Sequence, residues 1–263
     1  YQPHWAFIKP EKPTVPEVAN PTFINHPIDN FIVKKLEQQQ LTPSPKAAKE
    51  LLLRRITFDL TGLPPTIEEI NTFLADAAPN AYEKQVDRLL ASVYYGEKMA
   101  TDWMDVARFS DTYGYQVDRY RDMSPWRDWV IQSFNKNRPY DEFLTWQLAG
   151  DLLPNATKEQ ILATGFNRLH PLNMEDGIVG EEYRVESVSD RVAVLGDGIL
   201  GLTLSCAKCH DHKYDPISQK EYYEMYGFFN TINETGQISW DKATPPPTLE
   251  LPTERQAQVL KEL

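Results

Sequence analysis

Residues 124–169 read SPWRDWVIQSFNKNRPYDEFLTWQLAGDLLPNATKEQILATGFNRL and carry three helical patterns in succession. The first begins at Ser124 and Pro125, because a hydroxyl residue followed by proline is typical of a helix N-terminus. The other two run over 141–153 and 157–169, where apolar residues recur every three or four positions. Alternating strand patterns are scarce along the whole chain. The stretch therefore predicts an all-α fold, an irregular multi-helix domain.

The sequence before this stretch divides into a proline-rich arm and further helices. Five prolines precede residue 25, so residues 1–26 are expected to form an extended N-terminal arm. A proline at a first helical turn predicts a helix over 27–39. Another helix is expected from Ser44-Pro45 to Gly62. Capping patterns predict further helix starts at Thr66, with Glu69 completing a capping box, and at Asn80.

The sequence after residue 169 continues with a polar stretch over 170–180 and a long helical pattern over 183–204. Glycines between 196 and 201 weaken that pattern and predict a break there. Ser218 is expected to cap a last aromatic-rich helix. Residues 237–263 form a proline-rich linker or tail, which suggests a further C-terminal domain, so the helical domain is expected to cover 27–236.

Composition excludes several classes of protein. The 263 residues are 41% hydrophobic and 25% charged, which is typical of a globular chain. Apolar runs are far shorter than the roughly 20 residues of a membrane span, so no membrane span is expected. A net charge of −11 argues against a nucleic-acid partner, because phosphate binding needs a basic face. The N-terminus carries no leader pattern, so any targeting peptide is expected to lie outside this sequence.

The two cysteines of the chain both lie in Cys206-Ala207-Lys208-Cys209-His210. A C-x-x-C-H run is the attachment pattern for haem c, in which two thiols bond the vinyl groups and the histidine binds iron. Three other interpretations stay open. The pair could form a redox-active disulfide, although the expected βαβ pattern is missing. It could bind zinc with His210 or His212 and a further ligand, or it could be a plain structural disulfide or two buried thiols.

Several ordered motifs resemble the planctomycete cytochrome c-associated domain family, formerly of unknown function. The longest is LGLTLSCAKCHDHKYDPI over 200–217, and the others, spread over roughly 4–235, are HWAF at 4–7, PIDNFI at 27–32, FDLTGLPP at 58–65, YYGE at 94–97, RDWV at 127–130 and QLAGD at 147–151. Where the family commonly has glycine before the first cysteine, this chain has Ser205. The resemblance implies an extracytoplasmic bacterial protein, often fused to a further C-terminal domain, but implies no settled reaction.

A haem at this motif would need further partners from the chain. His210 is the expected iron ligand, and His170 is the first candidate for the sixth position, followed by Met174 and His4. His170 could equally be a histidine at a helix C-terminus that the helix carbonyls satisfy. His212 lies too close in sequence to reach the opposite haem face, so a hydrogen-bonding role is expected for it.

Cationic and aromatic side chains are the candidates for the haem periphery. Arg168 and Arg191 flank His170 and the motif in sequence and are candidates for the haem propionates, as is Arg184, although each could form an ordinary ion pair. Tyr115 lies in the polar, aromatic segment 111–119, which could line a haem-edge or substrate pocket or simply connect two helices.

These observations predict a periplasmic or otherwise extracytoplasmic c-type cytochrome domain with one covalent haem c, transferring electrons between a redox partner protein and a fused C-terminal domain. The first alternative is a haem-dependent oxidoreductase of peroxidase or oxygenase type that acts on a small molecule or glycan. The second is a binding module stabilised by zinc or a disulfide.

Overall fold

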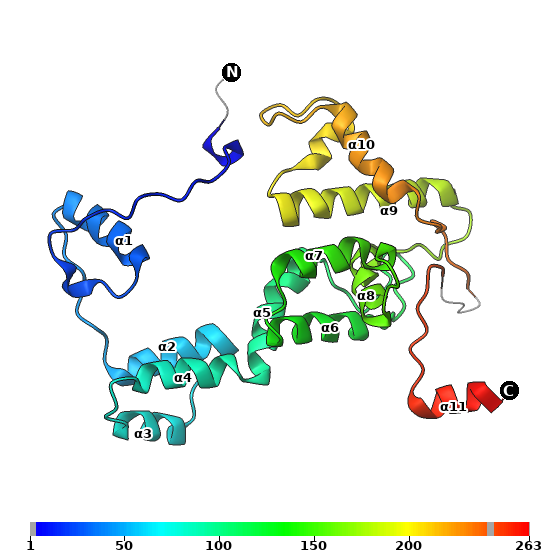
Figure 1. Ribbon diagram of the computed structural model, residues 1–263. Helices are drawn as coiled ribbons and strands as arrows, with labels where there is room; N and C mark the ends of the chain where they lie inside the picture. The colour runs from blue at the N-terminus through cyan, green and yellow to red at the C-terminus, as the bar shows by residue number, and fades with distance from the viewer. Residues whose placement is uncertain (1–3, 241–244, 263) are drawn as a thin grey trace. The chain divides into compact units, whose positions relative to one another are not determined.

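The computed structural model describes residues 4–240 and 245–262, and within them the chain forms eleven α-helices and no β-strand (Figure 1). The predicted all-α fold is therefore confirmed. The chain divides into two compact units, Tyr1–Leu52 and Leu53–Leu263. Parts of the expected arm and tail, namely residues 1–3, 241–244 and 263, lie outside the described residues. No helix in the described part is long and apolar enough to cross a membrane.

Among its described residues, the first unit contains one complete α-helix and the first turn of the next. Two short 3-10 turns, Trp5–Phe7 and Pro21–Phe23, interrupt the proline-rich segment, and helix α1 spans Pro27–Gln38. The helix begins at the predicted proline. Its N-terminus is closed by a reciprocal pair, in which the His26 side chain accepts a backbone hydrogen bond and the Asp29 carboxylate accepts one from the backbone N–H of His26.

Helices α2 (Lys49–Thr61), α3 (Ile67–Ala75) and α4 (Ala81–Leu90) share one apolar cluster. The predicted capping box of Thr66 and Glu69 is confirmed, and α2 ends before Gly62, whose φ is +70°. The predicted start at Ser44-Pro45 is wrong, since α2 begins only at Lys49; prolines at 43 and 45 disfavour helical geometry in the residues before them. Asn80 precedes α4, but its side chain makes no capping hydrogen bond.

Helices α5 (Val93–Val106), α6 (Ser124–Asn135), α7 (Tyr140–Ala149) and α8 (Lys158–Ala163) surround the largest core, which is rich in tryptophan and phenylalanine. Helix α6 begins at Ser124 as predicted. The patterns over 141–153 and 157–169 both end in 3-10 turns, Gly150–Leu152 and Thr164–Arg168. A Cβ at Gly150 would lie 2.2 Å from a backbone oxygen of Gln160, so this break lets two segments approach closely.

Helix α9 (Gly180–Val194) packs against α10 (Gln219–Asn230) (Figure 1). The predicted break follows α9. The chain widens into a π-helical turn over Leu195–Leu200, reverses at Gly201 with φ +65° and forms a 3-10 turn over Leu204–Lys208. Ser218 caps α10 as predicted, and α11 spans Glu254–Glu262. The 3-10 turn carries the C-x-x-C-H motif, so the break at 195–201 positions that motif.

Close packing of α5 on α6 generates a stability prediction. A Cβ at Gly96 would lie 2.4 Å from the Ile131 carbonyl oxygen, so Gly96→Ala is expected to lower the free energy of unfolding by about 1–3 kcal/mol. Gly227 of α10 is the matched control, since nothing lies within 4 Å of its Cβ position and alanine there is expected to be neutral or stabilising. Urea unfolding followed by circular dichroism measures both, and equal effects would contradict the packing argument.

Candidate functional site

The C-x-x-C-H motif lies on a platform built by α9 and α10. Leu204 and Ala207 of the 3-10 turn point into an apolar cluster with Val188, Val192 and Tyr222, and Ala207 is fully buried. On the same turn, Cys206 and Cys209 are exposed and unpaired thiols, and His210 is exposed after them. The buried alanine between the cysteines therefore holds the turn on the platform while both thiols face solvent.

Polar contacts fix the backbone around the motif. The Lys208 ammonium lies 3.0 Å from Glu186 of α9, and the Lys208 carbonyl accepts hydrogen bonds from the Gln219 amide at 3.2 Å and the Tyr223 hydroxyl at 3.1 Å. The Asp211 carboxylate accepts a hydrogen bond from the Gln219 backbone N–H at 2.8 Å. Both helices of the platform thus restrain the segment that carries the thiols.

His212 organises the loop after the motif. Its Nδ1 accepts hydrogen bonds from the backbone N–H groups of Tyr214 at 3.2 Å and Asp215 at 2.8 Å. Because Nδ1 accepts, the ring proton lies on Nε2, which contacts the Thr203 hydroxyl at 3.1 Å. His212 therefore joins the two ends of the 203–215 loop, in agreement with the hydrogen-bonding role expected for it.

His210 has the opposite arrangement. Its Nδ1 lies 2.7 Å from the Asp211 carbonyl oxygen, which can only accept a hydrogen bond, so Nδ1 carries the proton. Nε2 then keeps its lone pair, and no described residue hydrogen-bonds to it. A histidine whose Nδ1–H is held by a carbonyl while Nε2 stays open is the arrangement of a metal ligand.

This donor set fits what haem c requires: two unpaired, exposed thiols three residues apart, followed by an imidazole with an open Nε2. The described part of the chain does not offer a zinc site. It contains no group of three or more histidine, cysteine, aspartate or glutamate side chains that could hold a metal ion. The cysteines are also not joined as a disulfide.

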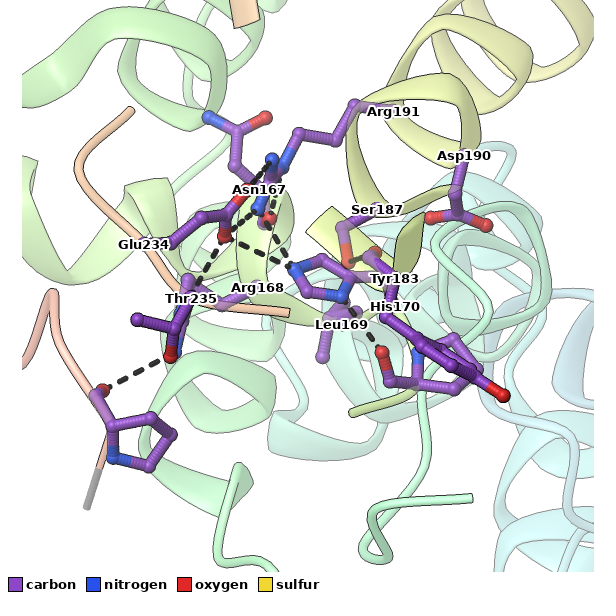
Figure 2. A network of polar contacts seen from close by, with 12 residues as sticks. Asn167, Arg168, Leu169, His170, Tyr183, Ser187, Asp190, Arg191, Glu234 and Thr235 are labelled. Carbon is purple, nitrogen blue, oxygen red and sulfur yellow. Dashed lines mark hydrogen bonds and ion pairs between the residues drawn. The ribbon is translucent and has the colours of Figure 1, made fainter. Parts of the chain in front are cut away.

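A second cluster of functional groups surrounds His170, whose side chain is completely buried (Figure 2). Its Nδ1 lies 2.9 Å from the Pro171 carbonyl oxygen and therefore donates. Its Nε2 lies 2.7 Å from Nη2 of Arg191, a group that can only donate, so Nε2 accepts. Both ring nitrogens are thus occupied in a neutral imidazole. Burial, with the nearby Arg191 charge, lowers the pKa of His170 below its usual 6.5.

Glu234, in the segment after α10, is the carboxylate of this cluster. Its oxygens lie 2.5 and 2.6 Å from the two Nη atoms of Arg191 and 3.1 Å from Nη1 of Arg168 (Figure 2). Burial opposes ionisation of Glu234, but the hydrogen bonds from Arg191 and the Arg191 charge outweigh it and lower the pKa to about 2. The Arg191 Nε also donates to the Asn167 carbonyl at 2.7 Å.

The structure therefore brings His170, Arg168 and Arg191 together around Glu234, and the haem roles expected for them stay predictions. As a sixth ligand, His170 would have to give up its hydrogen bond to Arg191. Met174 is buried in a small apolar cluster, and exposed His4 belongs to the first unit. Arg184 pairs with Glu181, and Tyr115 packs its ring edge-on against Tyr183 at 5.2 Å, with φ +56°.

Comparison with known proteins places the chain in a family. The family model PSCyt2, described as a protein of unknown function (DUF1549), matches residues 27–234. The chain belongs to this family. Membership in PSCyt2 agrees with the resemblance to a cytochrome-associated family in the sequence motifs, and the PSCyt2 description assigns no activity. No match was found among curated proteins or among solved structures.

Two residues of the buried cluster had no signal in the sequence. Glu234 lies in a polar segment after a helix, and Arg121 lies in an irregular connection between α5 and α6. The Arg121 guanidinium donates to the carbonyls of Arg168 and His170 at 3.1 and 3.0 Å. Glu234 is needed because the arginines are buried, and a buried arginine requires a carboxylate partner. Burial is not visible in sequence, so no sequence pattern points to Glu234.

The lowered pKa of Glu234 predicts an acid-dependent loss of stability. A carboxyl with a folded-state pKa of about 2, against an ordinary 4.5, stabilises the fold by an amount of the order of 3 kcal/mol above pH 4.5 and loses this between pH 4.5 and 2. In urea titrations, the free energy of unfolding of wild type is expected to exceed that of Glu234→Gln by the largest amount at pH 7. This difference is expected to shrink as the pH falls below 4.5. Glu224→Gln, at an exposed pair with Lys220, is the control expected to track wild type. A pH-independent gap for Glu234→Gln would refute the assignment.

Proposed function

We propose that this PSCyt2 chain is a c-type cytochrome domain in which Cys206 and Cys209 would hold one haem c and Nε2 of His210 would bind its iron. The observation that carries the proposal is the presentation of these groups: two free thiols and one imidazole with an open Nε2 face solvent from a single anchored turn. When bound, haem c supplies one-electron iron chemistry.

The chain's own residues have defined tasks in this proposal. Cys206 and Cys209 would hold the haem through thioether bonds, each made by adding the thiol S–H across one vinyl group, and the Asp211 carbonyl holds the proton of His210 on Nδ1, which leaves Nε2 open for the iron. Lys208, held by Glu186, Gln219 and Tyr223, keeps the turn in place, and this fixed backbone would hold the two thiols and His210 in position around a bound haem.

Exposure of the motif favours electron transfer over enzymatic catalysis. A peroxidase or oxygenase needs a pocket that excludes water from the reacting centre. Cys206, Cys209 and His210 lie on a surface turn and line neither of the two described cavities, so a haem held there would lie near the surface, where a redox partner can approach it. We propose a redox partner protein or a further domain of the same polypeptide as the electron donor or acceptor, and an extracytoplasmic location, since covalent haem attachment occurs outside the cytoplasm.

Covalent attachment is tested by expression in a bacterial periplasm together with the cytochrome c maturation machinery. Wild type is expected to stain for haem on a denaturing gel, and Cys206→Ala with Cys209→Ala is expected to lose the stain because no thioether can form. Ser205→Ala changes an exposed neighbour and should keep the stain. An unstained wild-type chain, or a stained double variant, would overturn the proposal.

His170 supplies a separate prediction about the iron. Because its Nε2 accepts a hydrogen bond from Arg191 inside a closed cluster, His170→Gln is expected to leave the absorption spectrum of the haem form unchanged while it lowers the melting temperature. His210→Gln is the comparison, expected to alter the spectrum or prevent haem attachment. A shift of the His170→Gln protein to a high-spin spectrum would instead identify His170 as the sixth ligand.

A further inference from the structure

A cavity of about 490 Å³ opens in the second unit beside the buried cluster, among α6, α8 and the segment 245–251. This volume is within the range of roughly 300–1,000 Å³ that small-molecule sites occupy. Its lining combines aromatic and aliphatic residues, among them Tyr113, Trp126 and Leu251, with Arg121 and Arg168. The proposed haem site, at Cys206, Cys209 and His210, contributes no residue to this lining.

Arg121 carries a buried charge that the described chain does not neutralise. Its exposed fraction is 8%, and its donors reach backbone carbonyls of Arg168, Leu169 and His170. No carboxylate among the described residues forms an ion pair with it, and its Nε is buried without a hydrogen-bond partner. Such a charge is costly unless something compensates it.

The other charged residues of the cluster add to this excess of positive charge. Arg168 and Arg191 share the single carboxylate of Glu234, and His170 is neutral. The cluster therefore holds three guanidinium groups and one buried carboxylate, an excess of two positive charges, and two of these arginines, Arg121 and Arg168, line the cavity. Burial, followed by the repulsion from Arg168, lowers the pKa of Arg121 to about 10, so Arg121 stays charged at neutral pH.

Carboxylates near the cavity do not remove this excess. Asp122 and Asp151 line the cavity, but both are exposed, and Asp122 is engaged by the backbone N–H and hydroxyl of Ser124 at 3.0 and 2.6 Å. Charges in contact with water interact weakly with a buried group because water screens them. Asp111 acts on Arg121 only at longer range, without an ion pair.

We propose that this cavity binds a small organic anion, with its carboxylate or other anionic group toward Arg121 and Arg168 and its apolar body against Trp126, Leu172 and Leu251. The anionic group supplies the negative charge that Arg121 lacks in the described chain. The aromatic and aliphatic side chains of the cavity contact the apolar part of the ligand. This site goes beyond the proposed electron transfer and does not depend on haem attachment. A net charge of −11 repels anions on average, so binding there requires the local excess of arginine.

The test compares a matched pair of probes, 2-naphthoate and the neutral 2-naphthamide, by isothermal titration calorimetry on the whole chain. Wild type is expected to bind the carboxylate at least tenfold more tightly than the amide, with an affinity that falls as salt is added. Arg121→Met is expected to remove this preference. Arg127→Met, at an exposed arginine paired with Asp128, should keep it.

A second variant tests the same proposal in case Arg121→Met does not fold. Thr248 lines the cavity and is exposed, so Thr248→Glu can be made without a change in the core. It is expected to weaken 2-naphthoate severalfold and to leave 2-naphthamide unchanged, while Thr248→Gln affects neither. Equal affinities of wild type for the two probes, absence of naphthoate binding at millimolar concentration, or equal weakening of both probes by Thr248→Glu would each overturn the proposal.

Discussion

The shared carboxylate of Glu234 joins three parts of the second unit. Arg191 comes from α9, Arg168 from the 3-10 turn after α8, and Glu234 from the segment after α10. Removing one partner of a buried, hydrogen-bonded charge leaves the others uncompensated, which is far more costly than losing a surface pair. Helix α9 belongs to this cluster through Arg191 and to the motif platform through Val188 and Val192. The geometry at the thiols therefore depends on a helix that Glu234 holds in place.

Much of the fold could be predicted because its signals are local. Proline at the first turn of α1, the capping box at Thr66 and the cap at Ser218 act within four residues of the helix start, so sequence contains the whole interaction. The start of α2 was placed wrongly because a serine-proline pair can precede a helix or only an extended turn. Helix α7 gives way to a 3-10 turn at Gly150, which approaches the Gln160 backbone of α8, a contact between two elements that the pattern of one helix does not contain.

The candidate site also combines residues that a local sequence pattern marks with residues that only the packed structure brings together. Cys206, Cys209 and His210 are candidates from sequence because the chemistry proposed for them depends on spacing along the chain. The haem roles expected for Arg168, Arg191 and His170 stay predictions, and Glu234, which the structure places with these three residues, lies 43 residues beyond Arg191 and has no motif. The charge balance of the cluster, and with it the unneutralised Arg121, depends on which side chains are buried together. That information exists only after the helices have packed.

The two histidines that follow the thiols hold their ring protons on opposite nitrogens, and this has a consequence for metal selectivity. His210 and His212 are two residues apart, a spacing at which two open imidazoles could chelate a stray nickel or copper ion. The backbone N–H groups of Tyr214 and Asp215 occupy the His212 lone pair, so only His210 presents one. The loop therefore offers a single open imidazole nitrogen, and His210 and His212 cannot hold one metal ion together in this arrangement.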